Sequence, residues 1–179
     1  KAYCMMNKQT IIDLLTKNYF SFINYINDLT TQELLFHEQQ KWTAGQQLQH
    51  IVLCVKPLVQ VFSMDKSMIA QNFGIADKPG RSYDVLLGEY LEKLNEGGKA
   101  PDRFVPENVL AEQRTGLSES LGQLINLLCS KIENFSEEDL DQLCIPHPLL
   151  GKLTLREMLC NAIYHVEHHG NQVKQNLDR

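Results

Sequence analysis

The sequence has almost no strand-like alternation, no closely paired cysteines, no cluster of basic residues and no long apolar run. Lys and Arg number 17 against 22 Asp and Glu, and the formal net charge is −5. Because the basic residues are scattered, no positive stripe is present to neutralise phosphates, and we expect no nucleic-acid partner. No stretch approaches the roughly 20 apolar residues that span a bilayer, so we expect no membrane partner.

The cysteines are odd in number and far apart, and none of them forms a CxxC spacing. They are Cys4, Cys54, Cys129, Cys144 and Cys160. We expect reduced thiols, which favours a cytoplasmic location over a secreted one. Residues 1–8 lack the apolar segment of a signal peptide, and we interpret them as a frayed or extraneous start of a single domain over residues 1–179.

Helical periodicity dominates the chain. Apolar residues recur at three- and four-residue spacing, which predicts long amphipathic helices over residues 9–28, 43–62, 107–135 and 154–177. Shorter helical pieces are expected after Thr30, before Gly74, over 82–95 and after Ser136. Pro57 is expected to bend the second long helix or weaken it. Residues 97–106 are expected to form a loop and 147–151 a turn, so the simplest packing is an all-α four-helix bundle.

The densest group of metal-capable side chains is His165, His168 and His169 in the last helix. On a helical wheel, His165 lies about 90° and His169 about 50° to the same side of the apolar stripe, whereas His168 lies about 150° away and is expected to face water. Imidazoles four residues apart on a helix can bind one metal ion together. The same spacing also fits surface histidines in ordinary hydrogen bonds, and the pair alone does not decide.

A third ligand has to come from another element. His50 is the candidate within a long helix, because His37 and His147 fall in connections. The wheel places His50 far from the centre of its own apolar stripe, so it is internal only if a second helix covers that flank.

Three segments carry a resemblance to a known family. They are WTAGQQLQHI at residues 42–51, HPLLGKLTLRE at 147–157 and HVEHHGNQ at 165–172. In this order and spacing the chain resembles the DinB/YfiT-like superfamily over residues 11–173. The resemblance implies a four-helix bundle with short extra helices in its connections. It also implies one divalent metal ion per chain on His50, His165 and His169, zinc or nickel by expectation, and a homodimer.

Three imidazoles leave an open coordination position, as in catalytic zinc sites. The resemblance therefore implies a metal-dependent hydrolase, or a transferase that activates a low-molecular-weight thiol, acting on a small molecule. No general base is assigned, although Gln46, Asn161 and Gln172 lie within a turn of a ligand and could orient it. The alternative is a non-catalytic helical interaction or dimerisation module in which the metal is structural or absent. We expect His147 to be a loop histidine that sets the entry of the last helix, and Trp42 to be a packing anchor before the second long helix.

Overall fold

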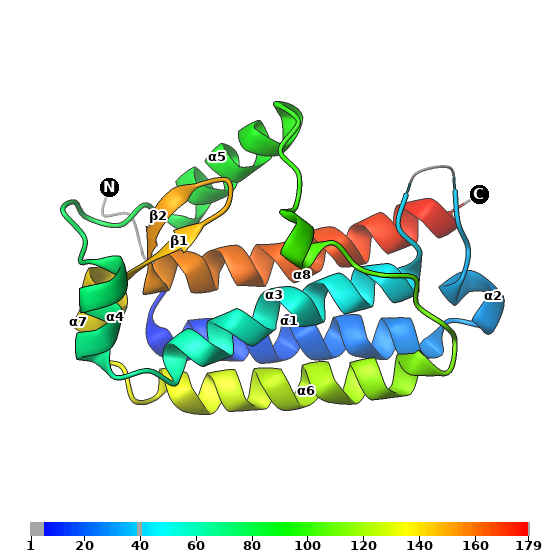
Figure 1. Cartoon of the computed structure of the whole chain (residues 1–179), viewed down its shortest axis with the longest axis horizontal. Helices are drawn as coiled ribbons and strands as arrows, with labels where there is room; N and C mark the ends of the chain where they lie inside the picture. Colours follow the sequence, from blue (N-terminus) through cyan, green and yellow to red (C-terminus); the bar gives the residue numbers. More distant parts are fainter. Residues whose placement is uncertain (1–5, 39–40, 179) are drawn as a thin grey trace.

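The structure is a computed structural model that describes residues 6–38 and 41–178 (Figure 1). Its long helices are α1 (Lys8–Asp28), α3 (Ala44–Phe62), α6 (Gln113–Ile132) and α8 (Leu155–Leu177). The shorter ones are α2 (Thr31–Leu34), α4 (Lys66–Phe73), α5 (Tyr83–Asn95), the 3-10 helix η1 (Asp102–Phe104) and α7 (Glu137–Gln142). The strands β1 (Cys144–His147) and β2 (Gly151–Thr154) form an antiparallel hairpin.

The four long helices form the bundle. Helix α6 packs against α1 and α3 on one side, and α8 packs against the same two helices on the other (Figure 1). Their apolar faces meet in one core, in which Leu15, Leu48, Leu121 and Leu159 have no exposed surface. The all-α bundle predicted from the periodicity is confirmed.

Capping boxes fix where the two site-bearing helices begin. Thr43 and Gln46 exchange side-chain and backbone hydrogen bonds at the start of α3, and Thr154 and Glu157 do the same at the start of α8. Helix α3 then continues through Pro57 without interruption.

Two segments differ from the sequence-based expectation. Residues 147–151 were expected to form only a turn, but they close the β1–β2 hairpin, in which His147 pairs with Gly151. The strands have four residues each, too few for alternation to reveal, and their pairing depends on tertiary packing. Helix α6 begins at Gln113 rather than at residue 107. The preceding segment instead buries Val109 against Gly45 at the start of α3, a contact that periodicity cannot show.

The segment from α5 to η1 bridges two bundle helices. Helix α5 contacts α8, and η1 contacts α3 (Figure 1). Before α5, the backbone N–H and Nε of Arg81 both donate to Oε1 of Glu157, at 2.8 Å each. Glu157 is buried at the start of α8, so this ion pair fixes the approach of α5 to the bundle. The segment thereby covers the groove between α3 and α8.

Cys54, Cys129, Cys144 and Cys160 are free thiols, while Cys4 lies outside the described residues. Residues 1–5 lie outside them too, but Lys8 belongs to α1, and its backbone N–H donates to Glu137 at 2.9 Å. Within residues 6–38 and 41–178, no helix combines the length and the apolar character needed to cross a membrane.

Candidate metal-binding site

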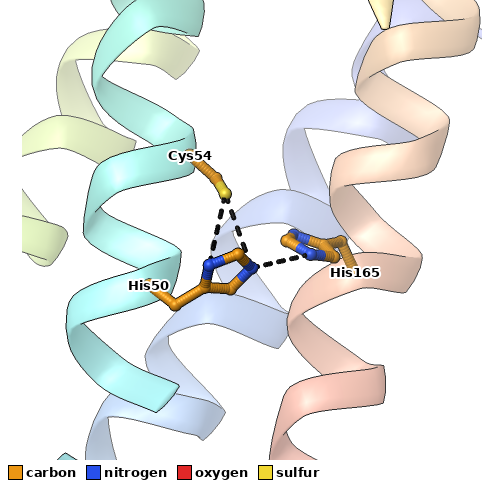
Figure 2. A group of neighbouring side chains, drawn as sticks. All are labelled: His50, Cys54 and His165. Atoms are coloured by element: carbon orange, nitrogen blue, oxygen red, sulfur yellow. Dashed lines mark hydrogen bonds between the residues drawn. The ribbon is translucent and has the colours of Figure 1, made fainter. Parts of the chain in front are cut away.

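Three histidine rings converge between α3 and α8. The Nε2 atom of His165 lies 3.3 Å from Nε2 of His50 and 3.0 Å from Nε2 of His169. Figure 2 shows His50 and His165 facing each other from the two helices. Nitrogen ligands on a tetrahedral zinc ion are about 3.3 Å apart, given Zn–N bonds of about 2.0 Å. The structure therefore brings together all three histidines that the family resemblance implied as ligands.

Hydrogen bonds at the far side of two rings fix which nitrogen faces the centre. Nδ1 of His50 lies 2.7 Å from the carbonyl oxygen of Phe104, and Nδ1 of His169 contacts Oε1 of Gln47. An oxygen of this kind only accepts, so Nδ1 carries the proton in both rings and Nε2 keeps its lone pair. This pattern of outer hydrogen bonds is typical of metal-binding histidines.

The donor set fits a cation. His50 and His169 both present an Nε2 lone pair to Nε2 of His165. A proton on that nitrogen of His165 can be donated to only one of them at a time, and the thiol of Cys54 is the other donor within reach of His50 Nε2. Imidazole nitrogens that converge in this way are a set of ligands that a divalent ion such as zinc binds.

Burial keeps the cluster neutral. It holds the pKa of His165 and of His169 well below 6.5, and each ring also lowers the pKa of its neighbours. His50, 3% exposed, has its pKa lowered by burial as well, against the raising effect of the Phe104 carbonyl. Neutral imidazole is the form that binds metal, so the site is prepared for an ion without first losing protons.

Cys54 lies beside this cluster, one turn after His50 on α3 (Figure 2). His50, Cys54 and His165 form a candidate metal-binding group whose ligand atoms all lie within 4.8 Å of one another. The Cys54 Sγ atom is 3.6 Å from Nε2 of His50 and 4.0 Å from Nδ1. If Cys54 Sγ and His50 Nε2 bound the same ion, the sulfur would lie on the side of the ion away from the imidazole ring, about 5 Å from Nδ1. The thiol is therefore beside the ring, and burial raises its pKa to about 12.

A cavity of about 740 Å³ adjoins the histidines, a size typical of small-molecule sites. Trp42 lines it and packs on the cluster, with its ring centroid 4.9 Å from that of His50. Tyr90 lines it from α5, with its ring 6.4 Å from that of His165. Tyr90 is only 6% exposed, and its ring lies edge-on to the rings of Tyr164 and His165. Its hydroxyl can donate a hydrogen bond to a molecule bound in the cavity.

The remaining sequence candidates have structural partners. His168 is half-buried rather than facing water, because Tyr164 and Gln172 pack beside it, and Nε2 of Gln172 lies 2.9 Å from its ring. Asn161 hydrogen-bonds His147. Nδ1 of His147 in turn accepts the backbone N–H groups of residues 149 and 150, which shapes the hairpin turn just before α8. Gln172 also hydrogen-bonds His169, so of these side chains it is the one that contacts an implied ligand.

Gln46 caps α3, and Gln47 is the residue that contacts His169. Sequence reasoning missed both Gln47 and Tyr90. Gln47 shares a helix face with His50, three residues on, and this spacing was the one available signal. No sequence signal indicated a role for Tyr90, because its position depends on how α5 is placed over the bundle.

Comparison with known proteins agrees with this geometry. The sequence profile of the DinB superfamily matches residues 14–173. The chain belongs to the DinB superfamily. No curated protein matches the sequence. The match covers α3 and α6 in full, α1 from residue 14 onwards and α8 up to residue 173. It therefore includes His50, Cys54, His165 and His169.

Proposed function

We propose that this DinB protein is a metal-dependent enzyme that binds one divalent ion, zinc or nickel, on His50, His165 and His169. The observation that carries the proposal is the convergence of three neutral imidazole nitrogens beside a cavity large enough for a small molecule. We take His169 rather than Cys54 as the third ligand because its Nε2 faces the centre, whereas the Cys54 sulfur lies beside the His50 ring.

The lining of the cavity favours transfer of a low-molecular-weight thiol over hydrolysis. Hydrolysis of a small molecule normally uses a general base to take a proton from water. No Asp or Glu lines the cavity within the described part of the chain, so no carboxylate is in place for that role. A thiol needs less help, because its own pKa of about 8.5 is far below the value of about 15.7 for water, and a bound divalent ion lowers it further.

The protein's own residues then have separable roles. Gln47 and the Phe104 carbonyl hold two of the imidazoles with Nε2 directed inward. Trp42 covers the cluster and limits the access of water. The Tyr90 hydroxyl can donate a hydrogen bond to charge that develops on the substrate, while burial raises the pKa of this phenol and keeps it protonated.

The test is elemental analysis of the purified, tag-free protein after reconstitution with zinc or nickel. We expect about one equivalent of metal per chain in the parent, and loss of that metal in His50→Ala and in His169→Ala. His168→Ala is the matched control, because it removes the adjacent histidine of α8, which hydrogen-bonds Tyr164 and Gln172 and touches His169 only ring edge to ring face. It should keep its metal. The loaded proteins are then assayed for transfer of small thiols to an electrophile such as 1-chloro-2,4-dinitrobenzene, with ester hydrolysis measured in parallel.

Absence of metal in the reconstituted parent would refute the proposal and leave the non-catalytic helical module as the better account. Metal without thiol transfer or hydrolysis would support a structural ion. The homodimer and the cytoplasmic location stay predictions, the first of which light scattering can check.

A further inference from the structure

The charge of the cavity lining is one-sided. Across the whole chain acidic residues outnumber basic ones, 22 to 17. The cavity reverses this balance, because its described lining contains Lys99 and Arg103 but no Asp or Glu. Both cations are exposed and still line the cavity, so they stand at its mouth. Neither takes part in an ion pair of the described residues, and the Arg103 guanidinium lies over the Phe104 ring, 4.8 Å from its centroid. Their charge therefore remains available to a ligand.

The interior of the cavity is apolar. It is lined away from the metal-site histidines by residues of α3, of the α3–α4 connection, of α4 and of β1, namely Leu58, Val61, Met64, Phe73 and Ile145. Burying an apolar body against such walls is favourable in proportion to the area removed from water. The polar side chains near the histidine end are uncharged or imidazole groups, among them the Tyr90 hydroxyl and the amides of Asn161 and Gln172. The lining thus combines apolar walls with positive charge at the mouth.

We propose that the cavity takes an apolar-bodied organic anion, with its acidic group at Lys99 and Arg103 and its body along α3 towards Phe73. The inference rests on the proposed function in that it names the substrate class of the same site. A cationic ligand would meet no negative side chain in this lining. A neutral ligand would gain no electrostatic attraction from Lys99 and Arg103. Two exposed cations together are expected to favour an anion about tenfold over a neutral molecule of the same shape.

Two fluorescent probes with the same aromatic body separate charge from apolar burial. They are 8-anilinonaphthalene-1-sulfonate, an anion, and N-phenyl-1-naphthylamine, which lacks the sulfonate. Trp42 is the one tryptophan of the chain and lines the cavity, so its quenching reports occupancy of this site rather than of the surface. The titrations use the full chain without metal. We expect the sulfonate to bind about tenfold more tightly than the amine, and dodecanoate to displace it better than dodecanol does.

The variant Lys99→Gln/Arg103→Gln should weaken binding of the sulfonate about tenfold and leave binding of the amine unchanged. Lys17→Gln/Lys56→Gln is the matched control, since it removes the same charge from exposed positions of α1 and α3 that do not line the cavity. It should leave both affinities unchanged. Equal affinities of the two probes, or an equal loss in the control, would overturn the inference. So would a bound sulfonate that neither quenches Trp42 nor yields to dodecanoate.

The metal-free format keeps the two proposals apart. If the parent binds no metal but selects the anionic probe, the metal-dependent enzyme is refuted and the anion-binding cavity is supported. If the parent binds one ion but shows no preference between the probes, the anionic substrate class alone is refuted.

Discussion

The stability of the metal-free protein should fall steeply between pH 6.5 and pH 5.5. In this interval the unfolded chain takes up protons on its histidines, whose ordinary pKa is about 6.5. The folded chain resists this uptake most strongly at three positions, and burial also lowers the pKa of His50 and of His168. Burial holds the pKa of His165 and of His169 well below 6.5, and it lowers that of His147 to about 4. Because the unfolded state then binds more protons, the free energy of unfolding decreases as the pH falls.

The magnitude follows from proton binding by the unfolded state. Between pH 6.5 and pH 5.5, one histidine with an unfolded pKa of about 6.5 and a much lower folded pKa removes about 1 kcal/mol of stability. The three together remove about 3 kcal/mol, a large part of the 5 to 15 kcal/mol typical of a domain. The loss begins as the pH falls through 6.5 and continues towards the depressed folded pKa values.

Urea unfolding followed by helical circular dichroism, in the presence of a chelator, measures this difference. The double variant His165→Asn/His169→Asn should show a loss about 2 kcal/mol smaller than that of the parent over the same interval, because two strongly contributing groups are gone. Comparing the pH dependence rather than the absolute stability removes the packing cost of the substitutions. Equal stability of the parent at the two pH values, or an undiminished pH dependence in the double variant, would refute the idea that burial keeps these histidines neutral.

Three further outcomes are expected. Replacement of Gln47 by Leu should weaken zinc affinity about 10- to 100-fold, because His169 loses the partner that orients it. Competition with a chromophoric chelator measures the affinity, and an unchanged value would show that Gln47 does not support metal binding. Cys54→Ala should keep one equivalent of metal, and cobalt-loaded parent protein should show no thiolate-to-cobalt charge-transfer band; a band that Cys54→Ala abolishes would make the sulfur a ligand. Tyr90→Phe should lower kcat for thiol transfer about 10-fold or more without changing metal content or melting temperature, because it deletes one hydrogen-bond donor that lines the cavity. Full activity would show that this hydroxyl does not contact the reacting group.

Local sequence was sufficient for the elements that capping and periodicity encode. The capping boxes at Thr43 and Thr154 mark the starts of α3 and α8, and the apolar stripes predict how far both helices run. The four-residue spacing of His165 and His169 likewise implies that both rings project from one side of α8. These features depend on contacts within a few residues, so they can be read without knowing the fold.

Only the tertiary structure decided what surrounds those rings. His50 lies off the apolar stripe of its own helix, and it is buried because α8 and the Phe104 carbonyl cover that flank. The contact between Gln47 and His169, and the position of Tyr90 over the cavity, join residues far apart in the chain. Helical periodicity defines which direction a side chain takes from its own helix, but not which neighbour it meets. The sequence by itself therefore determined the helices and one pair of histidines, while the packing of α3, α5, η1 and α8 made them a site.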